Sequence, residues 1–271
     1  MNNDTVEEIV PLKLYKYYSS NGIEKVLFDN TLRWNLPCEE NDPFEVLARC
    51  WDTEAAKEKA QGLRQEDMIF LEGIFDEKSV QEKVSHVTAF VSFSKYNNSI
   101  LMWAHYAGNH TGACLEFDAT KLQGFNVPQY VAYADPGEDR AEFPLPHENK
   151  QEDSSEYQNR ARDFLCKKAS EWTYEHECRW IAHPMSKYIG CKKEGDKFIL
   201  ISDIPSGAIT KLIFGCNVPI STRLAWAKRV RIRHPKCVFA EVVPDPKKYV
   251  LNIENLFMDE IETASSSPPE T

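Results

Sequence analysis

Long apolar runs are missing from this sequence of 271 residues, which therefore does not resemble an integral membrane protein. None of its apolar stretches approaches the roughly 18 residues that a membrane-spanning helix needs. The opening residues, MNNDTVEEIVPLK, also lack the basic segment and apolar stretch of a secretory signal. We therefore expect a cytoplasmic protein without a membrane partner.

Closely paired cysteines and glycine-rich phosphate loops are missing as well. The eight cysteines are spread without a CxxC pair, which excludes a crowded disulfide scaffold and fits none of the usual zinc spacings. Most stand in apolar stretches, as Cys114 does in GACLEF, which is typical of small reduced core residues. No GxxxxGKS/T or GxGxxG motif follows a predicted strand, so the common nucleotide-binding folds have no support. We expect no metal cofactor.

Charge and hydrophobicity narrow the class of protein further. Acidic residues outnumber basic ones by 42 to 32, and the net charge of −10 argues against non-specific coating of nucleic acid. A hydrophobic content of 42% excludes disorder of the whole chain. The basic segment 223–236 stands out from this background and could bind phosphates, RNA or an acidic partner, or form one solvated helix face.

Apolar periodicity predicts strands separated by helices without regular alternation, which indicates an α+β fold with a mixed, mainly antiparallel sheet. Predicted strands cover residues 11–18, 31–36, 86–96, 112–118, 178–184, 197–202, 209–215 and 237–243. Predicted helices cover residues 21–30 (with Asn21 as N-cap), 99–108, 158–171 and 221–229.

The remaining segments complete a single domain over residues 1–262. Residues 53–86 are dense in Glu, Lys and Gln with spaced apolar positions, which predicts an inserted helical layer. The acidic, proline-rich stretch 134–160 is typical of a long exposed loop. Composition predicts a disordered tail over 263–271.

Three short motifs carry residues suited to chemistry. Lys16 stands between Tyr15 and Tyr17, and a cation flanked by aromatic rings can hold a phosphate and stack a planar group. The alternative for Lys16 is an outward-pointing lysine on an edge strand. Ser92 and Ser94 are two residues apart on a predicted strand, so their hydroxyls share one face.

The carboxylate pair Glu175 and Glu177 is the sharpest of these motifs. Its spacing places both carboxylates on one side of an extended segment that enters a strand. Fixed negative charge of this kind serves reactions that pass through a sugar cation. The alternative is a structural ion network between Glu177 and Arg179.

An aromatic segment, MWAHY at 102–106, lies between these motifs along the chain. His105 could act as an acid or base, or be a buried, hydrogen-bonded histidine. A cleft lined by Trp103, Tyr106 and Trp172 could instead bind a nucleotide or a protein without catalysis.

Taken together, the motifs resemble a widespread bacterial family catalogued as domain of unknown function 2971. LYKYYS, NDPFE, SFS, MWAHY, GACLEFD and WTYEHECRW occur in this order in that family, over about residues 12–216. The family name conveys no activity. Its members look like defence- or mobile-element-associated proteins, which implies a role in phage defence or in a toxin-type conflict system.

A second resemblance is to the ADP-ribosyltransferases of the arginine-serine-glutamate class. These enzymes carry a basic residue on an early strand, a later Ser-x-Ser strand and a final Glu-x-Glu. Lys16, Ser-Phe-Ser at 92–94 and Glu-His-Glu at 175–177 follow the same order. Lysine replaces the family's arginine here, and Phe93 replaces the middle threonine. The resemblance implies a split sheet and NAD as the substrate.

Roles carried over from that class assign the catalytic set. Glu177 would hold a hydroxyl of the nicotinamide ribose and stabilise the sugar cation, and Ser92 would support Glu177. Glu175 would recognise or deprotonate the acceptor, and Lys16 would hold the NAD phosphates. The residues expected to contact NAD are Lys16, Tyr15, Tyr17, Ser94, Trp103, His105 and Tyr106, with Tyr17 or Tyr106 stacked on nicotinamide.

The resulting hypothesis is an ADP-ribosyltransferase-like effector that uses NAD and has a protein or RNA acceptor. The main alternative is a non-catalytic sensor that binds a nucleotide or a phage protein. A third hypothesis is a nuclease in which Asp42, Glu45 and the glutamate pair hold a divalent ion, although no spacing specific to a metal site unites them. The sequence does not set the oligomeric state.

Overall fold

The computed structural model describes residues 13–42, 44, 84–85, 88–122, 128–138, 140 and 163–266. The predicted inserted layer at 53–86 lies outside these residues apart from Val84 and Ser85, and most of the predicted loop at 134–160 lies outside them too. No helix in the described part of the chain is long and apolar enough to cross a membrane.

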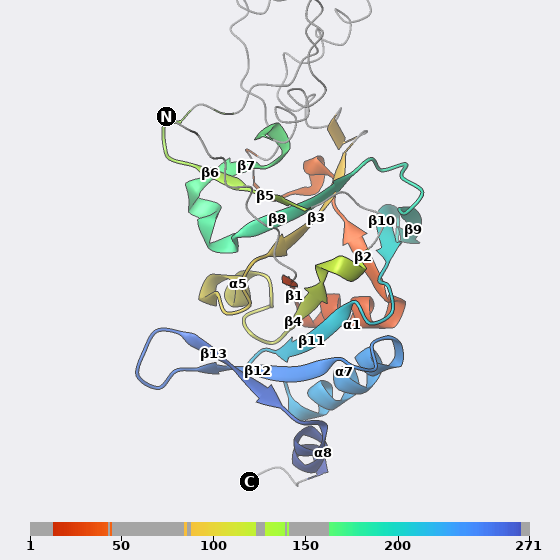
Figure 1. Cartoon of the computed structure of the whole chain (residues 1–271), viewed down its shortest axis with the longest axis vertical. Helices are drawn as coiled ribbons and strands as arrows, with labels where there is room; N and C mark the ends of the chain where they lie inside the picture. The colour runs from red at the N-terminus through yellow and green to blue at the C-terminus, as the bar shows by residue number, and fades with distance from the viewer. Residues whose placement is uncertain are drawn as a thin grey trace, which may run out of the picture.

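Eight strands form the main sheet, in the order β13-β12-β11-β4-β1-β3-β8-β5 (Figure 1). Their bounds are β1 (Lys13–Tyr18), β3 (Ala89–Ser94), β4 (Ala113–Asp118), β5 (Gln129–Tyr130), β8 (Glu177–Ala182), β11 (Ile209–Phe214), β12 (Val238–Pro244) and β13 (Leu251–Leu256). Neighbours run antiparallel except for β11 and β12, which are parallel. The expected α+β fold with a mixed, mainly antiparallel sheet is confirmed.

Two small sheets and several helices surround the main sheet. The three-stranded sheet contains β2 (Thr31–Trp34), β10 (Lys197–Asp203) and β9 (Gly190–Glu194), and β6 (Ala132–Ala134) pairs in parallel with β7 (Lys167–Ala169). The α-helices among the described residues are α1 (Ser20–Asp29), α5 (Ile100–His105), α7 (Ile220–Arg233) and α8 (Met258–Ser266). The same residues form the 3₁₀-helices η1 (Pro37–Glu39), η2 (Ala119–Lys121) and η3 (Ser170–Glu175).

The sheet separates two hydrophobic clusters, with α1 and α7 on one side and α5 on the other (Figure 1). Helix α1 buries Ile23, Val26 and Leu27, the apolar face that its periodicity predicted. The predicted N-cap Asn21 is wrong, because the extended residue is Ser19, whose hydroxyl accepts a hydrogen bond from the backbone N–H of Gly22.

A seam divides the main sheet between β1 and β3. Strand β1 pairs with β4 along its whole length, from Lys13 opposite Asp118 to Tyr18 opposite Ala113. Against β3, however, β1 has a single register pair, Tyr15 opposite Ser94. The sheet is therefore split into two parts that meet at one point.

Several predicted elements differ in the structure. Within the described part of the predicted helix at 158–171, residues 163–165 form a helical turn and are followed by β7 and η3. The sequence KKA of β7 has no strand propensity of its own, and its conformation comes from pairing with β6. Strands β5, β6, β9 and β13 were not predicted. Helix α8 continues to Ser266, so the predicted tail at 263–271 begins with helix.

Candidate functional site

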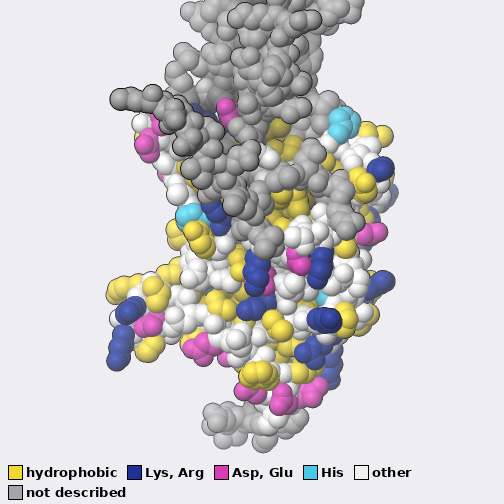
Figure 2. All heavy atoms as spheres, viewed as in Figure 1, with side chains coloured by type: hydrophobic (Ala, Val, Ile, Leu, Met, Phe, Trp, Pro, Cys, Tyr) yellow, Lys and Arg dark blue, Asp and Glu magenta, His cyan; other side chains and the backbone are white. Residues whose placement is uncertain are grey.

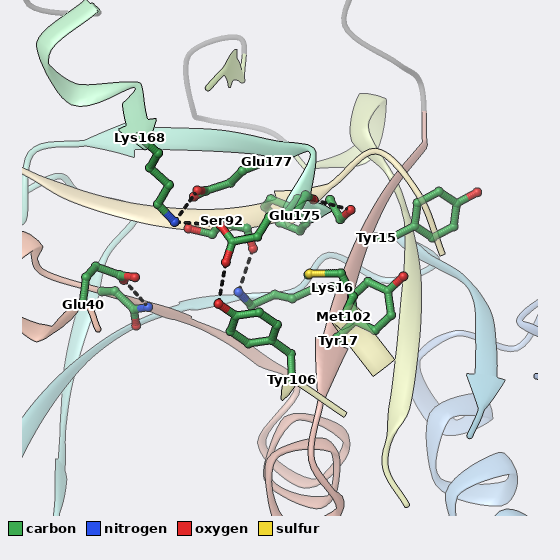
Figure 3. Close-up of a pocket in the computed structure, with 13 residues that line it drawn as sticks. Tyr15, Lys16, Tyr17, Glu40, Ser92, Met102, Tyr106, Lys168, Glu175 and Glu177 are labelled. Atoms are coloured by element: carbon green, nitrogen blue, oxygen red, sulfur yellow. Dashed lines mark hydrogen bonds and ion pairs between the residues drawn. The ribbon is translucent and has the colours of Figure 1, made fainter. Parts of the chain in front are cut away.

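A pocket of about 150 Å³ lies at the seam of the sheet (Figure 3). Its walls come from β1, β3, α5, β7 and the junction between η3 and β8, together with the segment after β2. The lining residues are Tyr15, Lys16, Tyr17, Asn35, Glu40, Ser92, Phe93, Ser94, Met102, Tyr106, Lys168, Glu175 and Glu177. All the residues predicted for the NAD site except Trp103 and His105 are among them, whereas Trp172 of the predicted aromatic cleft is not.

Trp103 and His105 do not line the pocket. Trp103 is fully buried in the core and meets the Tyr17 ring edge-on at 5.3 Å between centroids. His105 is exposed, so neither its predicted site role nor a buried histidine fits its position. The helical period explains both outcomes, because Met102 and Tyr106 are four residues apart and share the face that lines the pocket.

The two glutamates converge on one lysine, although the segment between them is not extended. Glu175 ends η3, His176 takes a left-handed conformation with φ of 42°, and Glu177 begins β8. The Nζ atom of Lys168 lies 2.8 Å from Glu175 Oε2 and 2.8 Å from Glu177 Oε2. Figure 3 shows the Lys168 side chain reaching down to this pair from β7.

Glu177 lies in a buried ion network, as the alternative from the sequence stated. Arg179 donates from Nε to Glu177 Oε1 at 2.7 Å and from Nη2 to Oε2 at 3.1 Å. Burial raises the pKa of Glu177, but the positive charges of Arg179 and Lys168 outweigh this and hold it well below its usual range. The backbone N–H of Glu177 donates to the Tyr133 hydroxyl at 2.8 Å. The carboxylate is thus ionised in a place shielded from water.

Glu175 has a second donor from the opposite wall of the pocket. The Tyr106 hydroxyl donates to Glu175 Oε1, while Lys168 occupies the other carboxylate oxygen. Burial and the negative charge of Glu175 raise the pKa of Tyr106, so its hydroxyl stays protonated. Tyr106 therefore links α5 to the glutamate pair.

Lys16 crosses the seam and is not an outward lysine on an edge strand. Its Nζ donates to the backbone carbonyl of Ser92 at 2.8 Å, and burial lowers its pKa. It lies 5.8 Å from the Phe93 ring and 5.9 Å from the Tyr18 ring, so its aromatic neighbours are not the two tyrosines that flank it in sequence. Among the described residues, no carboxylate forms an ion pair with Lys16.

The hydroxyls of those flanking tyrosines are already in use. Tyr15 donates to Glu116 Oε2 at 3.1 Å, and Tyr17 donates to the Tyr96 carbonyl at 2.9 Å. Their rings are therefore fixed by neighbouring strands, and a ligand would meet ring surface rather than free hydroxyls.

The two serines have different surroundings. Ser94 donates to the backbone carbonyl of Glu175 at 2.7 Å and so holds η3 against β3. The Ser92 hydroxyl is buried without a hydrogen-bond partner within the described structure. It does not support Glu177 as the resemblance implied, because Arg179 and Lys168 fill that role.

Sequence reasoning missed Lys168, Asn35 and Glu40 as pocket residues. Lys168 falls in a stretch predicted as helix, and nothing in the sequence distinguishes it from Lys167. Asn35 donates to Glu40 Oε1 at 2.9 Å on the wall formed by the segment after β2. Glu40 precedes the NDPFE motif, which gave the only sequence signal near this wall.

The basic segment 223–236 is partly absorbed by the fold. Arg223 bonds Glu241, Arg229 donates to the carbonyls of Leu27 and Phe28, and His234 is buried. On the face seen in Figure 2, basic and acidic side chains are interspersed over the described surface. The other basic side chains of the segment, Lys228, Arg231, Arg233 and Lys236, are exposed, so the segment combines buried structural contacts with a solvated basic surface.

The metal ligands of the nuclease hypothesis do not form a site in the described part of the chain. No cluster of three or more His, Cys, Asp or Glu side chains there is arranged to hold a metal ion. Asp42 Oδ1 accepts from the backbone N–H of Phe44 at 2.8 Å in a tight turn, and Glu45 lies outside the described residues.

The comparisons with known proteins can now be set beside this geometry. Neither the curated proteins nor the solved structures gave a match to the chain. Residues 102–180, which contain the α5 wall of the pocket, Lys168 and the glutamate pair, match the model of a known family. That family is described as Protein of unknown function (DUF2971), and it is the family that the motifs of this sequence resemble.

Proposed function

We propose that this chain cleaves the bond between nicotinamide and ribose in NAD and transfers ADP-ribose to an acceptor. One observation carries the proposal. Lys16, the serines of β3 and the glutamate pair come from three distant segments, were selected together by their motif order, and line the same pocket. The split of the sheet at this point agrees with the arrangement that the ADP-ribosyltransferase resemblance implied.

The chemistry of the reaction suits the charges of this pocket. When the C–N bond breaks, the positive charge of the pyridinium passes to the ribose and nicotinamide leaves as a neutral molecule. A buried, ionised carboxylate such as Glu177 can stabilise that sugar cation in a site of low dielectric constant. The acceptor then forms a bond to the ribose carbon and loses its proton, for which Glu175 is the adjacent base.

The volume of the pocket suits the nicotinamide ring of NAD and not the whole dinucleotide. A cavity of about 150 Å³ matches a single ring, since cavities of roughly this volume accommodate benzene. Nicotinamide with its carboxamide fits this scale, and the unpaired Ser92 hydroxyl offers that amide a hydrogen bond. The phosphates would stay nearer the seam, where Lys16 has donors to spare.

A second candidate function is non-catalytic binding of a nucleotide, as in a sensor for a defence system. It is favoured by one observation: Lys168 and Arg179 already neutralise both carboxylates, as in a structural ion network. Such a module would be stabilised by its ligand without forming a product.

The test is nicotinamide release from NAD by the purified protein, with and without cell lysate. We expect release that needs lysate, and a fall of about 100-fold or more in Glu177→Gln, since removing an electrostatic stabiliser of a transition state costs this much. Glu194→Gln is the matched control, because this carboxylate pairs with Lys25 on the surface away from the pocket. Thermal melts of every variant give the folded fraction to which activity is normalised.

The other outcomes separate the candidates. Release without lysate would identify an NAD glycohydrolase that uses the same site. If folded wild-type protein releases no nicotinamide under either condition, the transferase proposal is wrong. Thermal stabilisation by NAD or ADP-ribose without product would then support the binding module.

A further inference from the structure

Lys168 occupies the centre of the pocket's charge network. Its Nζ lies 2.8 Å from an oxygen of each glutamate, and its side chain is only 4% exposed. Its ammonium also lies 5.5 Å from the ring of Trp172. Such close enclosure fixes the ammonium between the two carboxylates (Figure 3).

The two carboxylates need a shared cation if both are to be charged. Like charges that share a buried site raise the pKa of one member of the pair. Arg179 compensates Glu177, whereas the cation that contacts Glu175 in the described structure is Lys168. Lys168 is therefore placed where it offsets both negative charges at once.

We propose that Lys168 is a positioning residue that keeps Glu175 and Glu177 ionised and side by side. Its role in catalysis rests on the proposed function, but its effect on the pair is measurable without NAD. Among the described residues, the other titratable and charged groups that face the pair are Tyr106, Tyr133, Tyr174, Lys16, Arg179 and Glu40.

The direction of the effect follows from these charges. Burial raises the pKa of Glu177, and the charges of Arg179 and Lys168 lower it. Without the Lys168 ammonium, one proton binds the pair at higher pH, and the fraction of protein with both carboxylates charged falls on the acid side. A lysine whose charge did not act on the carboxylates would leave their titration unchanged.

The experiment compares Lys168→Met with Lys168→Arg and with Lys167→Met. Lys167 is the matched control, because this neighbour pairs with Glu138 at 3.6 Å outside the pocket. Carboxyl ¹³C NMR of glutamate-labelled protein follows the two side chains, which are assigned with Glu175→Gln and Glu177→Gln. The pH profile of nicotinamide release is measured on the same samples.

In the wild type we expect both carboxyls to stay ionised from pH 5 to pH 8. In Lys168→Met one of them titrates within this range, so release falls towards pH 5, by about 10-fold for each unit by which the pH lies below the pKa of that carboxyl. In both Lys168→Arg and Lys167→Met we expect the two carboxyls to titrate as they do in the wild type.

An unchanged carboxyl titration in folded Lys168→Met overturns the proposal. Should that variant not fold, the wild type decides, since a carboxyl of the pair that titrates between pH 5 and pH 8 also overturns the proposal. If the titrations behave as expected but the wild type releases no nicotinamide, the proposed function fails while the ionisation role of Lys168 stands.

Discussion

Glu177 shows how a structural ion network and a reactive site can use the same charges. Its contacts with Arg179 and Lys168 are those of a buried salt bridge, which contributes little net stability once desolvation is counted. They do, however, keep an anion in a pocket that also holds an unpaired hydroxyl, that of Ser92. A purely structural network gives no reason for that hydroxyl, whereas a ligand that hydrogen-bonds to it does.

His234, outside the pocket, gives a pH dependence that can be measured. The ring is buried, its Nδ1 accepts from the backbone N–H of Ile209, and its Nε2 lies 2.9 Å from Asn30 Oδ1, so a neutral ring suits both contacts. Burial and the charges of Arg233 and Lys121 lower its pKa to about 4. The unfolded chain, with a pKa near 6.5, binds this proton more readily, so stability falls as pH drops through this interval.

We therefore expect His234 to account for about 2 kcal/mol of the stability that the wild type loses between pH 7 and pH 5. His234→Gln should be less stable than the wild type at pH 7, but its free energy of unfolding should fall correspondingly less between pH 7 and pH 5. Urea unfolding at pH 5, 6 and 7 measures the slope of the free energy of unfolding against pH for both proteins. Equal slopes in the two proteins would show that folding leaves the pKa of His234 unchanged.

The turn between α5 and β4 places two elements of the pocket wall. It passes through Gly108, Asn109 and His110, all with positive φ of 53–65°, before β4 begins beside β1. At Gly112 a Cβ atom would lie 2.0 Å from the backbone carbonyl oxygen of Tyr18. The absence of a side chain is thus what lets this turn lie against the end of β1 and keeps α5 over the seam.

Gly112→Ala should therefore be strongly destabilising, by about 2 kcal/mol or more, because the obstacle is backbone and cannot rotate away. Gly22→Ala is the matched control: its Cβ would lie 3.4 Å from the Ser19 hydroxyl within α1, so a neutral change or a gain of up to about 1 kcal/mol is expected. Thermal and urea unfolding of both variants measure this. Equal stability of the two would mean that the turn can open without cost.

For the molecule as a whole, periodicity predicted the sheet type, the buried face of α1 and the pocket strands β1, β3 and β8. These features depend on local alternation, which one sequence contains. Strand β7 and its Lys168 could not be predicted, because β7 forms by pairing with β6, about 35 residues away along the chain. That Trp103 and His105 lie outside the pocket could have been predicted, since helical spacing places both on other faces of α5 than Met102 and Tyr106.

The last prediction concerns the split sheet. Lys16 connects the two parts of the sheet across the seam, and we expect it to bind an anion there as well. Its ammonium has three donors, of which the Ser92 carbonyl takes one, and the described residues supply no ion pair. A phosphate bound there would gain charge-assisted hydrogen bonds worth roughly 1.5–3 kcal/mol.

Lys16→Met should therefore weaken ADP-ribose binding by about 10- to 100-fold in calorimetry. Lys197→Met on the exposed strand β10 is the control and should bind like the wild type. Undiminished binding by folded Lys16→Met would show that the two parts of the sheet are joined there for structure alone, and that the phosphates are held elsewhere.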